Sequence, residues 1–302
     1  MKVIVSTTVN PPTDAVRAFD SLPDWHLVVV GDRRTPDDYR LEHGTYLGPD
    51  DQQRIDPELS DAIGWNCIQR RNFGFLMAKE MGADVIASVD DDNLPYPTWG
   101  SGLMVGRHVE VAFYQTDLPV FDPLGATNYP HLWHRGYPLQ LLSHRDYSDQ
   151  STQTMVPNVQ ADFWNIEPDI DAICRMEHTP NCMFDDACFP LASNAMAPFD
   201  SQNTFIDAGV LADYFLFPGI GRMDDIWASY YAQACGAKVV FGKPSVDQQR
   251  NQHDLVTDMR QEYLGYERNL ALVEALQRDS EAIFDFIPPE SSRAFDLYRR
   301  HF

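Results

Sequence analysis

Cysteine, basic side chains and long apolar runs are scarce in this chain of 302 residues. The five cysteines are odd in number and form no Cys-x-x-Cys pair, which argues against a disulfide framework and against a structural zinc site. The sequence has no run of about 18 apolar residues, so we expect no membrane-spanning segment. The first apolar stretch is too short for a signal peptide, because Pro11 and Pro12 end it. These absences predict a protein of the reducing cytoplasm.

The charge of the chain is strongly acidic. Lys and Arg total 23 whereas Asp and Glu total 45, which gives a formal net charge of −22. Such a chain repels polyphosphate surfaces at long range, so nucleic acid is not an expected partner. A small anionic ligand would need a local positive pocket or a divalent cation. The apolar fraction of 44% is enough for a buried core.

Three short apolar runs predict strands of an α/β protein, at Val3–Ser6, His26–Val30 and Val85–Val89. Helix-like segments alternate with them. This alternation predicts a mostly parallel sheet flanked by helices, whose ligands bind at the carboxyl ends of the strands. Polar residues follow two of these strands, at Gly31–Arg34 and at Asp90–Asn93, which is where such a fold places its site.

The remaining elements are less sharply marked. We expect a helix that ends near Leu22, a long helix over Asp61–Met81 capped by Ser60, and irregular structure between Val109 and Pro198, with short strands at Val109–Tyr114 and around Met196. A helix at Ile226–Cys235, a strand at Lys238–Phe241 and helical spacing from Leu264 onwards complete the pattern. The economical division is a catalytic domain over residues 1–263 and a C-terminal helical appendage over 264–302.

The triplet Asp90, Asp91 and Asp92 is the strongest local signal for chemistry. Three adjacent carboxylates repel one another unless a cation or several hydrogen-bond donors lie among them. In an extended chain, Asp90 and Asp92 point the same way and can share one metal ion, while Asp91 points elsewhere. The alternative is a solvated acidic loop, which is common in acidic proteins.

Two pairs of arginines are candidates for binding an anion. Arg70 and Arg71 lie in an apolar segment, where an arginine is costly unless it meets an anion, so we expect one of them to face the site. The alternative is that both extend to solvent. The same two alternatives, contact with an anion or exposure to solvent, apply to Arg33 and Arg34. Asp32 beside them could instead accept hydrogen bonds from a base or ribose.

Several stretches of the chain resemble the flavin-independent nucleotide-sugar mutases, also called reversibly glycosylated polypeptides, and secondarily the STELLO-type glycosyltransferases. The matching stretches keep their order over roughly residues 1–265 and are Arg71–Phe75, Val89–Asp92, His134–Pro138, Trp164–Ala172, Phe189–Pro190 and Gly221–Ala228. The STELLO-like features are Asn203–Thr204 and the segment Gln249–Leu255. Matching order and spacing make this resemblance more specific than any one motif.

The resemblance implies a GT-A-like fold, a divalent Mn²⁺ or Mg²⁺ ion and no flavin. It assigns Asp90, Asp91 and Asp92 to the metal and diphosphate, and it places Arg135 on the family's reversibly glycosylated arginine. A guanidinium is a poor nucleophile at neutral pH, so the residue chemistry favours Arg135 as a charge clamp on the diphosphate or sugar. Without this motif, we would interpret Arg135 as a surface arginine in a turn.

The resemblance also assigns the remaining site residues. Asp224 and Asp225 begin a helix and would orient the sugar or move protons, although helix capping alone explains one of them. His253 is a candidate metal or phosphate ligand, and an ordinary surface histidine is the alternative. The loops after the first strands would contact the nucleotide, together with Arg70, Arg71 and the first two aspartates of the triplet. The nucleotide-binding candidates are Thr7, Thr8, Asn10, Asp32, Arg33, Arg70, Arg71, Asp90 and Asp91.

The resulting hypothesis is a metal-dependent mutase that interconverts the pyranose and furanose forms of a nucleoside-diphosphate sugar. The non-plant segments favour a bacterial type of mutase, which in this group acts on GDP sugars such as GDP-L-galactose or GDP-fucose in antibiotic biosynthesis. The alternatives are a GT-A glycosyltransferase that passes the sugar to an acceptor, and a nucleotide-sugar-binding scaffold without activity. A homo-oligomer is compatible with the sequence, which does not specify the oligomeric state.

Overall fold

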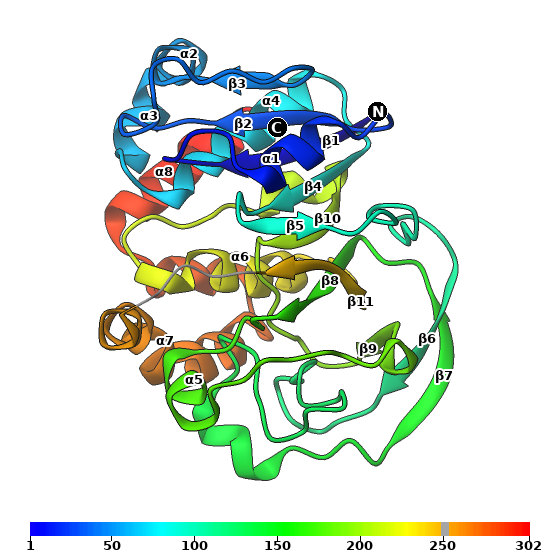
Figure 1. Ribbon diagram of the computed structural model, residues 1–302. Coiled ribbons are helices and arrows are strands. Elements are labelled where there is room, and N and C mark those ends of the chain that lie inside the picture. The colour runs from blue at the N-terminus through cyan, green and yellow to red at the C-terminus, as the bar shows by residue number, and fades with distance from the viewer. Residues whose placement is uncertain (249–253) are drawn as a thin grey trace.

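The structure is a computed structural model and describes residues 1–248 and 254–302. Within these residues, the fold is built around one mixed sheet of 11 strands (Figure 1). The order along the sheet is β3-β2-β1-β4-β10-β8-β11-β9-β6-β7, and β5 pairs with β11. The strands are β1 (Lys2–Thr7), β2 (His26–Val30), β3 (Thr45–Leu47), β4 (Val85–Val89), β5 (Asn93–Pro95), β6 (Val109–Tyr114), β7 (Gln150–Met155), β8 (Val159–Ile166), β9 (Leu191–Ser193), β10 (Asn203–Asp207) and β11 (Val239–Gln248).

The sheet has a parallel half and a mixed half. In the first half, β1 pairs in parallel with both β2 and β4, so the carboxyl ends of these strands share one edge. In the second half, β10 pairs antiparallel with both β4 and β8. The expected α/β class, with a mostly parallel sheet flanked by helices, is confirmed, and the sheet is a mixed one. The predicted strands at Val85–Val89 and Val109–Tyr114 are β4 and β6.

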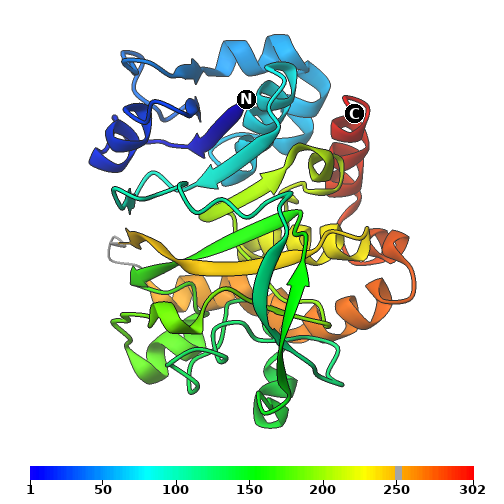
Figure 2. The same ribbon diagram turned by 90° about the vertical axis from the view of Figure 1, so that its right-hand side faces the viewer.

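Helices flank the sheet along its length (Figures 1 and 2). The α-helices are α1 (Asp14–Asp20), α2 (Pro49–Ile55), α3 (Pro57–Ile63), α4 (Arg71–Glu80), α5 (Ala172–His178), α6 (Asp224–Ala234), α7 (Leu255–Leu276) and α8 (Pro289–Arg299). Short 3₁₀ helices are η1 (Ile68–Arg70), η2 (Leu139–His144), η3 (Asp186–Cys188), η4 (Ala208–Asp213), η5 (Gly221–Met223) and η6 (Ser280–Asp285). Within the described ranges, no helix is both long and apolar enough to cross a membrane.

The long helix predicted over Asp61–Met81 is wrong. The segment instead forms α3, η1 and α4, and the residue that caps α3 is Asp56 rather than Ser60. Gly64 ends α3 with a φ of +80°, a conformation that glycine adopts readily and other residues rarely do. The chain then turns before η1, which brings Arg70 and Arg71 to the edge where β1, β2 and β4 end.

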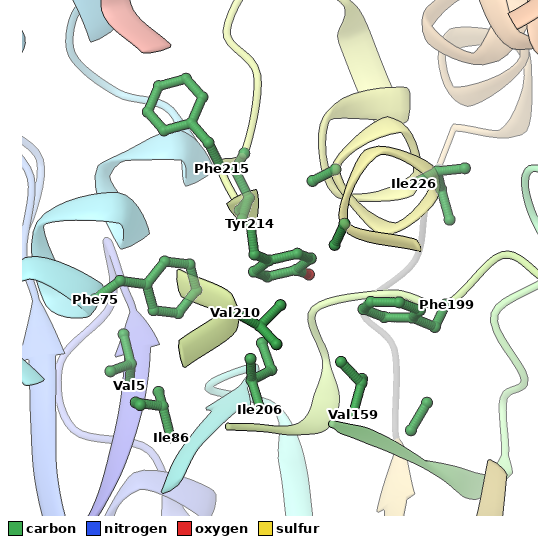
Figure 3. Close-up of a cluster of buried hydrophobic side chains, with 14 of the residues drawn as sticks. Val5, Phe75, Ile86, Val159, Phe199, Ile206, Val210, Tyr214, Phe215 and Ile226 are labelled. Carbon is green, nitrogen blue, oxygen red and sulfur yellow. The ribbon is translucent and has the colours of Figure 1, made fainter. Parts of the chain in front are cut away.

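A cluster of buried side chains joins the two halves of the sheet (Figure 3). Val5 of β1 and Phe75 of α4 lie on one side of it, and Ile226 of α6 lies on the other. Tyr214 packs between them, with its ring centroid 5.8 Å from that of Phe75 and 5.7 Å from that of Phe199. Because these contacts are apolar and fully buried, the two halves share one core.

The C-terminal helices belong to this same core. The expected boundary at 263/264 falls inside α7, which begins at Leu255. On α8, Phe295 and Tyr298 are fully buried, and their rings lie 5.3 and 5.0 Å from the ring of Phe215. The chain is helical beyond Leu264 as expected, and α8 packs on the common core through Phe295 and Tyr298. The division into a catalytic domain and an appendage stays a prediction.

Candidate active site

The carboxyl ends of β1, β2 and β4 enclose a pocket of about 280 Å³. Thr7, Thr8 and Asn10 line it from the end of β1, and Asp32 and Arg34 line it from the end of β2. Asn66, Cys67, Ile68, Arg70 and Asp91 complete the lining. The pocket suits a base and ribose in size, because it lies close to the lower end of the volumes that small ligands occupy.

Hydrogen bonds between the loops fix the shape of this pocket. Thr8 Oγ1 donates to Asp91 Oδ2 (2.5 Å), and Asn10 Nδ2 donates to the same oxygen (3.2 Å). The carboxylate of Asp32 accepts from the backbone N–H of Arg33 (2.6 Å) and of Cys67 (3.2 Å). The aspartates therefore hold the walls in place and still present polar atoms to the pocket.

Arg33 and Arg70 do not reach the pocket with free guanidinium groups. Both groups lie over the ring of Trp65, at 4.5 and 3.8 Å from its centroid. Arg70 also donates to Gln52 Oε1 (2.6 Å) and to the carbonyl of Ser60 (3.0 Å), and burial lowers its pKa to about 10. The pocket lining includes Arg34 and Arg70 but not Arg33. Contact of Arg33 and Arg70 with a nucleotide stays a prediction.

Arg71 connects the aspartate triplet to the interior. Its guanidinium is buried and donates to Asp90 Oδ1 (2.6 Å), Thr7 Oγ1 (3.2 Å) and the carbonyl of Ser201 (2.7 Å). Burial opposes the charge of Arg71, but the carboxylate of Asp90 outweighs this effect and raises the pKa of Arg71. Burial also raises the pKa of Asp90 despite that ion pair.

The triplet offers an oxygen-rich donor set that fits a hard divalent cation. Asp91 turns towards Thr8, and the triplet lies in a turn in which the N–H of Asn93 donates to the carbonyl of Asp90 (3.4 Å), so the extended conformation expected for Asp90–Asp92 is wrong. Next to them, Asn93 Oδ1 is buried and accepts no hydrogen bond, and neither does Gln248 Oε1 on the strand paired with Asn93. Asp90, Asp92 and these amide oxygens would hold Mg²⁺ or Mn²⁺. The remaining predicted ligand, His253, lies outside the described residues.

Arg135 is enclosed by protein carboxylates. Its Nε donates to Asp169 (2.9 Å), its Nη1 and Nη2 donate to Asp225 (3.0 and 3.1 Å), and Nη1 also donates to the carbonyl of Arg222. Gly136 makes this approach possible, because its φ is +92° and a Cβ there would lie 2.3 Å from Ile226 of α6. All three guanidinium nitrogens therefore donate to protein acceptors, and the expected clamp on a diphosphate or sugar stays a prediction.

The two aspartates that begin α6 have different environments. Asp225 binds Arg135, which outweighs burial and lowers the pKa of Asp225. Asp224 accepts a hydrogen bond from Gln69 Nε2 (2.6 Å), and burial together with the neighbouring Asp225 raises its pKa to about 7. The N-cap residue of α6 is Met223, so neither aspartate occupies the capping position. Asp224 is thus the member of the pair that can exchange a proton near neutral pH.

A buried hydrogen-bond network links the triplet to Arg135 through Ser201. Ser201 accepts from Arg71, and its N–H and Oγ–H both donate to Asp225 Oδ2 (3.0 and 3.1 Å). Asp200, beside it, is buried, and burial together with Asp169 raises its pKa well above the usual range. The sequence analysis assigned no role to Ser201, Asp200 or Asp169, because the polar partners that pair with them lie 24 to 130 residues away along the chain.

The chain has measurable relatives among known proteins, although no protein-family profile matches it. Two proteins of Arabidopsis thaliana align with it, STELLO2 with 21% identity over 268 residues and STELLO1 with 22% over 261. Both are described as probable glycosyltransferases. In sequence, the chain is similar to glycosyltransferases. Each alignment covers 77% of this chain and 33% of the relative, so the chain spans about a third of their length.

Solved structures of glucosyl-3-phosphoglycerate synthase from Mycobacterium tuberculosis superpose on most of the chain. The complex with Mn²⁺, UDP-glucose and phosphoglyceric acid has 12% identity and a TM-score of 0.49, and covers 89% of this chain and 79% of that chain. The complex with Mn²⁺, UDP-glucose and glycerol 3-phosphate has 12% identity and a TM-score of 0.48, with coverages of 89% and 80%.

Proposed function

We propose that the chain is a metal-dependent enzyme of glycosyltransferase type, which binds a nucleoside-diphosphate sugar and breaks the bond between the anomeric carbon and the diphosphate. The observation that carries the proposal is one continuous surface. Asp91 belongs both to the nucleotide-sized pocket and to the triplet whose neighbours, Asp90 and Asp92, fit a divalent cation. A diphosphate leaving the pocket would therefore meet the cation directly.

Each group of residues would have a different role, which depends on where it lies in the site. Thr8, Asn10 and Asp32 would bind the ribose and base from the pocket wall. A cation held by Asp90 and Asp92 would stabilise the negative charge that develops on the leaving diphosphate. Arg71 keeps Asp90 ionised and fixed in place through its 2.6 Å ion pair. Asp224, with a pKa of about 7, is our candidate for exchanging a proton with a sugar or acceptor hydroxyl.

The proposal is tested with purified protein, Mn²⁺ and a panel of UDP- and GDP-linked sugars, by chromatography of the nucleotide products. We expect metal-dependent turnover that falls at least about 100-fold in Asp92→Asn, because the charge stabilisation acts on the leaving group. Asp117→Asn, at an exposed aspartate, is the matched control and should leave turnover unchanged. Equal turnover with excess EDTA, or in Asp92→Asn, contradicts the metal-dependent role.

A specific contact favours a mutase as the second candidate. Arg135 lies in one mutase-like stretch and Asp225 in another, and the fold brings them together at 3.0 Å in the interior. On this hypothesis, the sugar opens, recloses through another hydroxyl and recaptures the diphosphate. The preferred donor would be a GDP sugar such as GDP-L-galactose or GDP-fucose.

One assay separates the candidates. The protein is incubated with Mn²⁺ and GDP- or UDP-linked galactose, fucose or arabinose, without acceptor or flavin, and the ring form is read by NMR. A furanose product of unchanged mass supports the mutase and shows the base preference. Turnover that begins only when an acceptor is added supports the transferase. Binding of nucleotide and Mn²⁺ without turnover of any donor supports a scaffold and rejects both enzymes.

A further inference from the structure

A second set of metal-ligating side chains lies in the interior, apart from the aspartate triplet. His134, Asp169 and Asp200 come from three separate segments, and one ligand atom of each lies within 4.8 Å of the others. All three side chains are at least nine-tenths buried, with exposed fractions of 2%, 0% and 6%. Neither the nucleotide pocket nor the proposed proton exchange uses this set.

The histidine presents a lone pair to the carboxylates. Nδ1 of His134 lies 2.6 Å from the carbonyl oxygen of Arg135, which can only accept, so Nδ1 carries the hydrogen. Burial lowers the pKa of His134 and favours the neutral ring. Its Nε2 then carries a lone pair and lies 3.8 Å from Asp200 Oδ2. Two acceptors that face each other in this way call for a proton or a cation between them.

The positive charge that acts on Asp200 is that of Arg135, which other carboxylates share. The nearest cation that acts on Asp200 is Arg135, which pairs with both Asp169 and Asp225. Three buried carboxylates therefore surround one guanidinium in this part of the described chain. Leaving a buried carboxylate ionised without a compensating charge is costly, and a divalent cation would supply that charge.

Two neighbouring side chains also lack partners that a hydrated cation would provide. Gln202 Oε1 is buried and accepts no hydrogen bond, while the backbone N–H of Gln202 donates to Asp200 (2.8 Å). Trp164 Nε1 is buried and donates to nothing, and its ring lies 5.9 Å from that of His134. The amide oxygen needs a donor or a cation, and the indole needs an acceptor.

We propose that His134, Asp169 and Asp200 bind a divalent transition-metal ion at a site distinct from the aspartate triplet. Ligand distances of about 2.1 Å allow two ligand atoms to lie up to about 4.2 Å apart, so the 3.8 Å between His134 and Asp200 fits a shared ion. Asp169 contributes a carboxylate oxygen that lies within 4.8 Å of the ligand atoms of His134 and Asp200. The imidazole ligand favours a transition-metal ion such as Zn²⁺ over Mg²⁺.

The site is tested by titrating the metal-free full-length protein with Zn²⁺ in excess Mg²⁺, which occupies the triplet. We expect one tightly bound Zn²⁺ per chain in the wild type and in Asp92→Asn, measured by elemental analysis and calorimetry. Asp200→Asn and His134→Gln should bind Zn²⁺ at least tenfold more weakly. Asp162→Asn, at a buried carboxylate outside the set, is the matched control and should bind normally.

Thermal unfolding measured with and without Zn²⁺ separates loss of metal binding from loss of stability, because each variant is compared with itself. Zn²⁺ should raise the midpoint of the wild type and of Asp162→Asn, but not that of Asp200→Asn, because only a ligand of the folded state stabilises it. Absence of Zn²⁺ and Mn²⁺ binding to the wild type in Mg²⁺ would overturn the proposal, and would indicate that Asp200 carries a proton instead. Equal binding in Asp200→Asn would also overturn it. The test does not depend on any sugar-nucleotide activity.

Discussion

At the scale of single residues, Arg135 forms buried ion pairs with both Asp169 and Asp225. Removing its guanidinium would leave these two carboxylates buried without their shared cation. We expect Arg135→Met to lower the free energy of unfolding by about 3–5 kcal/mol, the usual loss when one partner of a buried ion pair is removed. Urea denaturation measures this difference. Arg17→Met is the control, because Arg17 pairs with Asp14 at the surface and should change stability by less than about 1 kcal/mol. Equal effects in the two variants would contradict the structural role of Arg135.

Asp224 predicts a pH dependence with a definite sign. Its pKa is about 7 in the folded chain, whereas an unfolded aspartate has a pKa near 4, so between these values the folded state holds the extra proton. The stability contributed by this proton is present at about pH 4 and is lost as the pH rises to 7. The stability of Asp224→Asn relative to the wild type should therefore increase over this window, by on the order of 2–4 kcal/mol, and stay constant above it.

The measurement is urea denaturation of both proteins between pH 4 and 8.5. Asp162 and Asp171 also have pKa values raised to about 7, but both are present in the two proteins and cancel in the difference. A difference that does not change with pH would show that Asp224 keeps an ordinary pKa in the folded chain.

At the scale of elements, α4 lies unusually close to β1 because residue 74 is glycine. A Cβ at Gly74 would lie 2.3 Å from Val5 Cγ1 and 3.0 Å from Val30 Cγ2. In an open helix, replacing glycine by alanine gains about 1 kcal/mol, but here we expect Gly74→Ala to destabilise the protein by about 1–3 kcal/mol through overpacking. A double-mutant cycle with Val5→Ala measures the coupling. We expect the second change to recover part of the loss, and simple additivity would exclude the steric explanation.

The strands β1, β2 and β4 were predictable from sequence because each is a short apolar run that ends at polar residues. Val85–Val89 and Asp90–Asp92 illustrate this, since the same segment marks the strand and the predicted metal ligands. By contrast, β7 and β8 lie in the segment that we expected to be irregular, and the polar sequence of β7 gives no apolar signal. The helix over Asp61–Met81 was not predictable in the same way. Helical spacing continues on both sides of Gly64, and only the backbone conformation of that glycine divides it. Periodicity reports which faces are apolar and does not report where the chain turns.

At the scale of the whole molecule, sequence reasoning anticipated the pocket at the ends of β1, β2 and β4 better than it anticipated the interior network. Thr8, Asp32 and Asp91 follow strands that share one edge, so topology alone brings them together. Asp200 and Ser201 follow no pattern of this kind. Their partners come from distant segments that meet only after the antiparallel strand β10 has joined the sheet, and charge and polarity in the sequence do not encode that meeting.

The burial of α8 predicts that the chain folds as one unit. Phe295 and Tyr298 pack on Phe215, which in turn lies beside the core around Tyr214. We expect deletion of residues 289–302 to leave an apolar surface open and to abolish the cooperative thermal transition, whereas the full chain unfolds in a single step. Phe295→Ala should cost about 3–5 kcal/mol, and Phe302→Ala, at a residue that is 41% exposed, should cost much less. Calorimetry on the truncated and full chains decides the point: a sharp transition of unchanged midpoint after truncation would restore the independent C-terminal appendage.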